Sequence, residues 1–328
     1  MVLNLLGLLG LSLFPLPVKA APGGMTFEQP IACKLGETCV IQQYFDHDPG
    51  TGVADYRCGA QTYDGHDGTD FRIPDHAALT RGVPVIAAAD GFTVGVRDGE
   101  PDATGSGYDQ AAVKDKECGN GVVIRHTNGW ETQYCHMRKG SIRVKANAIV
   151  KAGTVLGFVG QSGMAAFPHL HFSLRHKGEK IDPFFSQAAC SNGASLAGSK
   201  WRPHDQKALA YREAFVLNTG FTTAALEMGD IEKAGLPAPS SDAAAIIAYV
   251  RAIGLRAGDT QSLTVTDPAG AVMSDSALPA LDRNKAQYLL YTGRKRPPGG
   301  WLKGQYSARY ALKRQGRVIA EKVFTFTL

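Results

Sequence analysis

The stretch AFPHLHFSL, residues 166–174, places two histidines one residue apart within an apolar run. Side chains two residues apart in an extended strand lie on the same face. We therefore expect His169 and His171 to point to one side of a strand, and Leu170 and Phe172 to point into the core on the other side. Paired imidazoles of this kind have three interpretations: polar surface residues that are adjacent by chance, a hydrogen-bonded pair, or part of a metal site.

Two other segments add polar side chains of the same type. His66 and Asp70 are four residues apart in HDGTD, where glycine disfavours a helix, so an extended segment would place both on one face. In ETQYCHM, strand alternation places Tyr134 and His136 on one face and Cys135 on the other. Each pattern alone is weak, because isolated histidines in strands are usually structural.

Short alternating segments separated by glycine turns predict the fold class. VPVIAAADGFTVGVR, residues 83–97, breaks at an Asp-Gly pair, and NGVVIRHTNGWETQYCHM, residues 120–137, breaks at an Asn-Gly pair. Each segment is typical of two strands joined by a tight turn. Since no helical period accompanies them, the sequence predicts a mainly β protein with an antiparallel sheet folded on itself.

The order of these motifs resembles that of the M23 family of zinc metallopeptidases, the LytM and lysostaphin-like endopeptidases of bacterial cell walls. The resemblance spans about residues 60–185 and is carried by HDGTDF (66–71), DG (90–91), GNGV (119–122), YCHM (134–137) and PHLHF (168–172). It implies a LytM-type antiparallel β-fold with a duplicated hybrid motif. It also implies one Zn²⁺ per chain, held by His66, Asp70 and His171, and catalytic roles for His136 and His169.

The implied chemistry suits these residue types. Two imidazoles and one carboxylate leave one zinc position for water, whose pKa the metal lowers to about 7. His136 and His169 would take the proton of this water and stabilise the oxyanion or protonate the leaving amine, and which residue does which stays open. We find no HExxH, GxSxG, GxGxxG or Walker motif that would offer a competing site.

By the same resemblance, the expected substrate is a peptide cross-link of peptidoglycan stems, with a D-alanyl-diaminopimelate bridge favoured. Two alternatives stay open. One is a non-catalytic LytM-like activator of a cell-wall amidase, although such regulators characteristically lose zinc ligands and all five positions are present here. The other is a metallopeptidase that cuts protein or peptide substrates.

The N-terminus and the cysteines predict export. An apolar run up to Leu16, followed by small residues around Ala20, is typical of a secretory signal at residues 1–20, although no Lys or Arg precedes it. We therefore expect a periplasmic or secreted protein without stable membrane insertion. Six cysteines in an exported chain favour disulfides, and Cys33 and Cys39 are close enough to close a small loop. The pairing of the other cysteines stays open: Cys58, Cys118, Cys135 and Cys190.

A length of 328 residues allows two domains. We expect the metallopeptidase domain at residues 27–190, a small polar linker at 191–200, and an immunoglobulin-like accessory β-sandwich at 201–328 that offers a site for a protein partner. Within the sandwich, residues 243–249 are compatible with a strand or a helix. The formal net charge of +5 is too small to predict a nucleic-acid partner.

Two features depart from the compact family pattern. The polar loop at residues 98–118 is long, and GMAAFPHLH inserts residues before the paired histidines. Both are expected near the cleft, and we predict that the loop is a movable lid. The histidines outside the motifs are expected at the surface: His47, His76, His126, His176 and His204.

Overall fold

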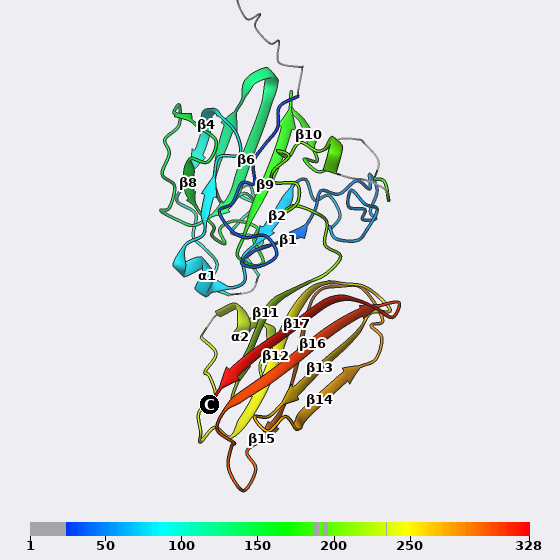
Figure 1. Ribbon diagram of the computed structural model, residues 1–328. Helices are drawn as coiled ribbons and strands as arrows, with labels where there is room; N and C mark the ends of the chain where they lie inside the picture. Colours follow the sequence, from blue (N-terminus) through cyan, green and yellow to red (C-terminus); the bar gives the residue numbers. More distant parts are fainter. Residues whose placement is uncertain (1–23, 106, 186–189, 193–195, 234) are drawn as a thin grey trace, which may run out of the picture.

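Antiparallel strands dominate the computed structural model, which confirms the mainly β class (Figure 1). The structure describes residues 24–105, 107–185, 190–192, 196–233 and 235–328, so the expected signal at 1–20 lies outside the described residues. The two α-helices of this described part are single short turns, His76–Arg81 (α1) and Met228–Lys233 (α2). None of its helices is long and apolar enough to cross a bilayer.

The candidate site lies on an eight-stranded antiparallel sheet in the N-terminal half. The strand order is β1-β2-β9-β6-β5-β4-β7, with β10 paired to β9, and a two-stranded sheet of β3 and β8 lies apart from it. The strands are Val40–Gln43 (β1), Thr69–Arg72 (β2), Pro84–Ile86 (β3), Gly91–Arg97 (β4), Asn120–Arg125 (β5), Trp130–Met137 (β6), Ile149–Val150 (β7), Val155–Phe158 (β8), His169–His176 (β9) and Glu179–Ile181 (β10).

The pairing of β2 with β9 brings the two main motifs together. Asp70 lies opposite His171, although about a hundred residues separate them in the chain. Leu170 and Phe172 are fully buried in the core beneath the sheet, as the alternation in PHLHF predicts. Burial of these side chains fixes the strand register, because a slip by one residue would turn the apolar side chains outward.

Two further antiparallel sheets make up the C-terminal half. A three-stranded sheet, β11-β12-β15, and a four-stranded sheet, β14-β13-β16-β17, share one apolar core. Residues 243–249 overlap strand β12, so the helix alternative is wrong; from Ala245 to Val250 every second side chain is buried, as in a strand with one face on the core. The strands are Phe215–Thr222 (β11), Ala245–Leu255 (β12), Thr260–Thr266 (β13), Val272–Leu278 (β14), Lys285–Lys295 (β15), Gln305–Arg314 (β16) and Arg317–Thr327 (β17).

The segment between the two halves packs against the N-terminal core. Trp201 and Leu209 are fully buried among the apolar residues of that core, and the backbone N–H of Phe27 donates to the carbonyl of Lys200. The first C-terminal strand begins at Phe215. The immunoglobulin-like topology and the domain limits stay predictions.

All six cysteines form disulfides in the structure. Cys33 pairs with Cys39, as their proximity in sequence indicates, and the other pairs are Cys58–Cys190 and Cys118–Cys135. The last pair joins the end of the 98–118 loop to the strand that carries His136. The cross-link therefore lies directly beside the candidate site.

Two of the histidines expected at the surface are buried, so that prediction was wrong for them. His126 is 7% exposed and bonds to the carbonyl of Asp90 and the hydroxyl of Thr132. The His47 side chain is 3% exposed and contacts the Asp182 carboxylate at 2.8 Å. Both imidazoles are buried because specific polar partners replace the water they lose.

Candidate active site

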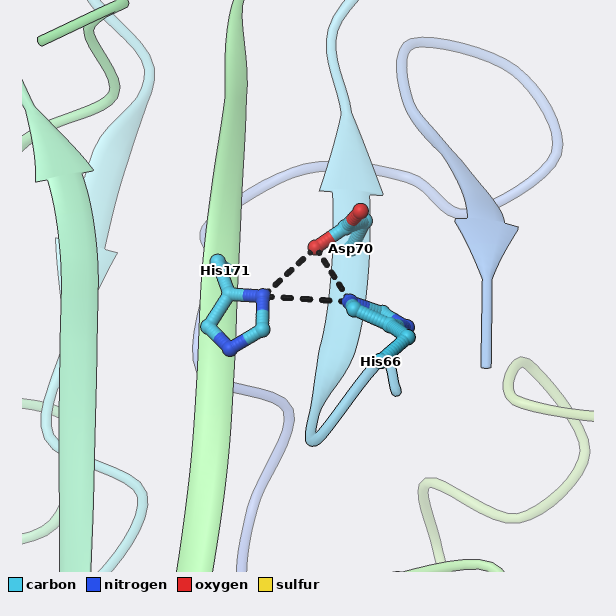
Figure 2. A group of neighbouring side chains, drawn as sticks. All are labelled: His66, Asp70 and His171. Atoms are coloured by element: carbon cyan, nitrogen blue, oxygen red, sulfur yellow. Dashed lines mark hydrogen bonds and ion pairs between the residues drawn. The ribbon is translucent and has the colours of Figure 1, made fainter. Parts of the chain in front are cut away.

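Three side chains form a compact group just before β2, near the start of β2 and on β9 (Figure 2): His66, Asp70 and His171. The Oδ1 atom of Asp70 lies 3.1 Å from Nε2 of His66 and 2.9 Å from Nδ1 of His171. The two nitrogens lie 3.1 Å apart. Tetrahedral zinc with bonds of about 2.0–2.2 Å requires ligand atoms about 3.3 Å apart, so one ion fits with small adjustments.

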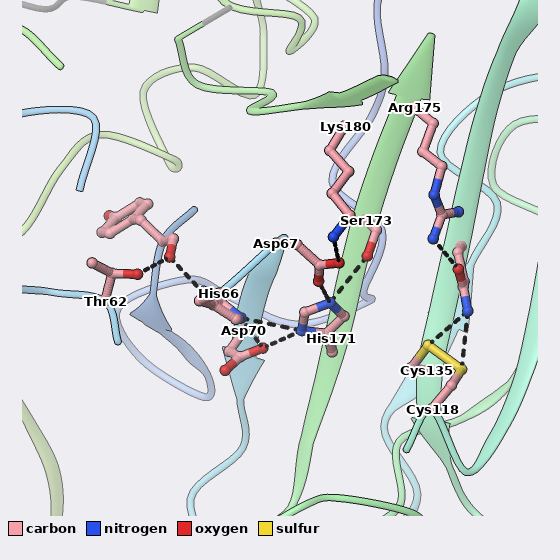
Figure 3. Close-up of polar contacts among 12 residues, drawn as sticks. Thr62, His66, Asp67, Asp70, Cys118, Cys135, His171, Ser173, Arg175 and Lys180 are labelled. Carbon is pink, nitrogen blue, oxygen red and sulfur yellow. Dashed lines mark hydrogen bonds and ion pairs between the residues drawn. A yellow bond between two sulfur atoms is a disulfide. The ribbon is translucent and has the colours of Figure 1, made fainter. Parts of the chain in front are cut away.

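Hydrogen bonds on the far side of each ring fix which nitrogen faces the group. Nδ1 of His66 donates to the carbonyl of Tyr44 at 2.6 Å, which leaves its Nε2 without a proton in the neutral ring. Nε2 of His171 contacts the Ser173 hydroxyl at 3.0 Å and an Asp67 carboxylate oxygen at 3.3 Å, so its Nδ1 faces inward (Figure 3). Such outer partners are typical of metal-binding histidines.

One ring nitrogen of each of the two histidines and a carboxylate oxygen of Asp70 therefore point at the same position. A cation bound there would interact favourably with all three atoms. Burial alone would raise the pKa of Asp70, but the imidazoles of His66, His169 and His171 hold it well below its ordinary value. Burial alone would lower the pKa of His171, but Asp67 and Asp70 raise it to about 9. The group thus favours a positive charge, either a proton or a metal ion.

Gly68, inside HDGTD, allows the segment before β2 to lie close against β9. A Cβ atom on Gly68 would lie 2.6 Å from Nε2 of His171 and 2.7 Å from the carbonyl oxygen of Phe172. Any larger residue would displace the ring from its position opposite Asp70. The glycine is thus required for packing against β9.

His169 lies on the same side of β9 as His171 and is almost fully buried. Its Nδ1 donates to the carbonyl of Phe167 at 2.8 Å, and its Nε2 lies 3.6 Å from Oδ1 of Asp70. Burial lowers the pKa of His169, which keeps the ring neutral near pH 7. A neutral Nε2 beside the three-residue group has the form of a general base.

His136 reaches the site through a β-bulge near the end of β6. Strand alternation would place it beside Tyr134, but Tyr134 is fully buried in the core, whereas Cys135 and His136 both line the groove. That prediction was wrong because β6 has one extra residue between the pairs Val122–Tyr134 and Asn120–Met137, where His136 adopts φ 60° and its N–H donates to the carbonyl of Cys118. Its Nδ1 then donates to the carbonyl of Ser162 at 2.8 Å.

The rings of His136 and His169 lie together, with centroids 4.6 Å apart. Burial also lowers the pKa of His136 to well below its ordinary value, and the two neighbouring histidines add to this effect. Two neutral imidazoles, each with Nδ1 bound to a carbonyl, therefore flank the three-residue group. All five residues singled out in the sequence are thus brought together.

A groove of about 460 Å³ opens over the group, a volume typical of ligand sites. His66, His136 and His171 line one part of it. Farther along β9, Arg175 donates to Oε1 of Gln133 at 2.5 Å, and the amide nitrogen of Gln133 contacts both sulfurs of the disulfide (Figure 3). This part of the groove presents the guanidinium of Arg175 and the side-chain amide of Gln133.

The long 98–118 loop and the insertion before the paired histidines, which both depart from the compact family pattern, meet at the groove. The N–H of Met164, in the insertion, donates to the carbonyl of Glu117, in the 98–118 loop, and both residues line the groove. The carboxylate of Asp102 accepts from the N–H groups of Lys139 and Gln161, which ties the loop to neighbouring segments. Glu117 and Cys118, at the end of the loop, form part of the groove lining, and movement of the loop as a lid stays a prediction.

Several supporting groups were not found from the sequence. Asp67 follows His66 directly, and an acidic residue beside a candidate ligand is a signal that could have marked it. The backbone carbonyls of Tyr44, Ser162 and Phe167 leave no such signal, because any residue supplies a carbonyl. Their role depends on the tertiary structure alone.

Residues 64–183 match the sequence pattern of peptidase family M23, over a segment that contains all five candidate residues. The segment is an M23 peptidase domain. The family resemblance seen in the motifs is thereby confirmed.

Relatives of the M23 domain include enzymes of the bacterial cell wall. A DD-carboxypeptidase/endopeptidase, Mpg, of Neisseria meningitidis is 38% identical over 119 residues, which are 36% of this chain and 22% of the relative. A peptidoglycan DD-endopeptidase, ShyA, of Vibrio cholerae is 34% identical over 117 residues, again 36% and 22%. The match thus spans about a fifth of the length of these relatives.

A zinc-containing peptidase from Vibrio cholerae is a related solved structure. It is 26% identical, with a TM-score of 0.28, and the match covers 48% of this chain and 36% of that chain.

Proposed function

We propose that this protein is an exported zinc endopeptidase that hydrolyses peptide cross-links of bacterial peptidoglycan. The carrying observation is the convergence of His66, Asp70 and His171 at a groove, with the paired rings of His136 and His169 beside them. Relatives named as peptidoglycan DD-endopeptidases support a role as a cell-wall peptidase.

We assign His66, Asp70 and His171 as the ligands of one zinc ion. The donor set of two imidazoles and one carboxylate is one that catalytic zinc sites use. When bound, zinc supplies Lewis acidity, which polarises a peptide carbonyl and acidifies water. Asp67 supports the set by holding the outer nitrogen of His171.

We assign His169 and His136 to proton transfer and charge stabilisation. Nε2 of His169 is unprotonated when Nδ1 donates to Phe167, so this nitrogen accepts a proton from the attacking water. The proton that His169 accepts then passes to the leaving amine, directly or through Nε2 of His136, which holds no proton of its own while Nδ1 donates to the carbonyl of Ser162. Because the two rings interact directly, their titration is coupled and belongs to the pair.

The groove beyond the proposed ligands carries charges of both signs, with the guanidinium of Arg175 and the carboxylates of Asp64, Asp67 and Glu117 in its lining. Arg175 and Lys180 present positive charge along β9 and β10, although Glu131 and Asp67 partly neutralise them. Peptidoglycan stems carry free carboxylates, and a D-alanyl-diaminopimelate bridge is the bond we favour. The periplasm or the exterior is the compartment that this substrate and the three disulfides suit.

Digestion of purified sacculi, with the products identified by mass spectrometry, tests the function. We expect cross-linked muropeptides to be converted to uncross-linked ones. An activator of an amidase would leave sacculi intact until the amidase is added, and a protein peptidase would cut casein but not sacculi. Either of these results would replace the proposed function.

A further inference from the structure

The C-terminal half contacts the strands that carry the candidate active site. At the end of β2, the Arg72 guanidinium is fully buried and forms an ion pair with Glu232 of α2. The same carboxylate oxygen pairs with Arg251 of β12, also fully buried. In Figure 1, α2 and β11 accordingly face α1 and the ends of β1 and β2.

This ion-pair group extends to the segment that follows β2. Arg251 donates to the carbonyl of Pro74, and its Nε donates to the side chain of Asn218 at 2.9 Å. Asn218 in turn donates to the Asp75 carboxylate at 3.1 Å. The contact therefore fixes both the last residue of β2 and the start of α1.

Glu232 is the carboxylate that pairs with both guanidiniums in the group. A buried charge without a partner is strongly unfavourable, so the position of Arg72 depends on Glu232. Two neutral side chains also accept from Arg72: Gln42 at 2.6 Å and Gln287 of β15 at 3.2 Å. Two of the three side chains that accept hydrogen bonds from Arg72 thus come from the C-terminal half.

Arg72 also contacts the segment that orients His169. Its guanidinium carbon lies 4.1 Å from the centre of the Phe167 ring. The carbonyl of Phe167 accepts the Nδ1–H of His169, and the two rings lie 4.8 Å apart. Across the strand pair, Arg72 is the register partner of His169. A continuous chain of contacts therefore runs from Glu232 through Arg72 and Phe167 to His169.

We propose that Glu232 is a positioning residue for His169. It holds Arg72 against Phe167, and this contact places the carbonyl that fixes the tautomer and the direction of the imidazole. The C-terminal half is then part of the catalytic apparatus and not only a module for recruitment. The proposal rests on the proposed function, because that function assigns His169 to catalysis.

The variant Glu232→Gln tests this link in the full-length, zinc-loaded protein. We expect metal content and KM to be retained, because Glu232 touches neither the ligands nor the groove, and kcat on a soluble cross-linked muropeptide to fall by about tenfold or more. Tyr211→Phe is the matched control, since it removes a hydroxyl of the connecting segment that donates to Asp55 at 2.7 Å and accepts from Arg256 of the C-terminal half at 3.3 Å. The control should leave kcat unchanged.

A readout that does not depend on turnover is the imidazole N–H signal of His169 in the NMR spectrum, assigned by its absence in His169→Ala. Glu232→Gln should shift or broaden this signal, whereas Tyr211→Phe should not. If wild-type protein were inactive on peptidoglycan, the proposed function would fail while this signal still tested the link.

A double-mutant cycle that combines Glu232→Gln with Phe167→Leu tests whether Glu232 acts on His169 through Phe167. If Glu232 acts through Phe167, the loss of kcat in the double variant will be smaller than the product of the two single losses. Should Glu232→Gln fail to fold, Gln287→Leu will replace it, with a smaller change of the His169 signal expected. Unchanged kcat together with an unchanged His169 signal would overturn the proposal.

Discussion

In each of the four histidines of the site, one ring nitrogen contacts a supporting group and the other faces the site. The ring nitrogens of His66 and His171 that face away from the group contact the Tyr44 carbonyl and the Asp67 carboxylate, so their inner nitrogens converge on Asp70. The rings of His136 and His169 stand beside this point, each fixed through Nδ1. We therefore expect substitutions of the proposed ligands and substitutions of the flanking rings to have different effects.

Replacing a ligand should remove the metal. His66→Ala, Asp70→Ala and His171→Ala each delete one of three donors, and we expect zinc content to fall sharply in all three variants. Elemental analysis of the purified proteins checks this. Asp67→Asn serves as a milder comparison, with metal affinity lowered by about 10–100-fold as expected for an outer partner. Full zinc in every ligand variant would contradict the assignment.

Replacing a flanking ring should leave the metal in place. His169→Ala and His136→Ala should retain zinc and lose turnover by about a hundredfold or more, as is typical when a positioned acid or base is removed. Zinc analysis and steady-state kinetics on the same preparations test the separation. Loss of zinc from either variant would move that residue into the ligand set.

At the scale of the element, β6 shows where sequence reasoning stops. Alternation predicts the faces of β9 correctly, because that strand is regular and its apolar side chains are buried. On β6 it fails at His136, where positive φ and a bond to the Cys118 carbonyl redirect the side chain. The proximity of the five candidate residues was predictable from motif order, whereas the carbonyls that orient them depend on contacts between distant segments.

The disulfide beside His136 should stabilise this irregular strand end. Cys118 and Cys135 are 17 residues apart, so their replacement by alanine is expected to lower the free energy of unfolding by about 3 kcal/mol. Chemical denaturation measures this loss. Replacing Cys33 and Cys39, which are 6 residues apart, is the comparison and should cost less. An equal or larger loss for the shorter loop would refute the loop-length explanation.

At the scale of the whole molecule, the two halves share a buried contact that the sequence did not reveal. The Arg72, Glu232 and Arg251 charges lie within it, and Val40 packs against Leu217 and Ile253 nearby. The small polar segment at 191–200 predicted a linker, but the side chains that join the halves lie far from it in sequence. Local composition therefore could not predict the contact.

This shared contact predicts cooperative unfolding. Exposing the buried charges of either half would destabilise the other, so differential scanning calorimetry should show a single transition. Glu232→Gln should separate that transition into two or broaden it. Two well-separated transitions in the wild-type protein would show that the halves unfold independently.

The central claim is that the M23 domain cuts peptidoglycan cross-links with a metal held by His66, Asp70 and His171. Turnover of a purified D-alanyl-diaminopimelate cross-linked dimer, followed by mass spectrometry before and after chelation, tests it most directly. We predict cleavage to monomers, loss of activity after chelation, recovery when zinc is added to the wild-type protein, and no recovery for His171→Ala. An intact dimer with the zinc-loaded wild type, or cleavage that survives complete removal of metal, would contradict the claim.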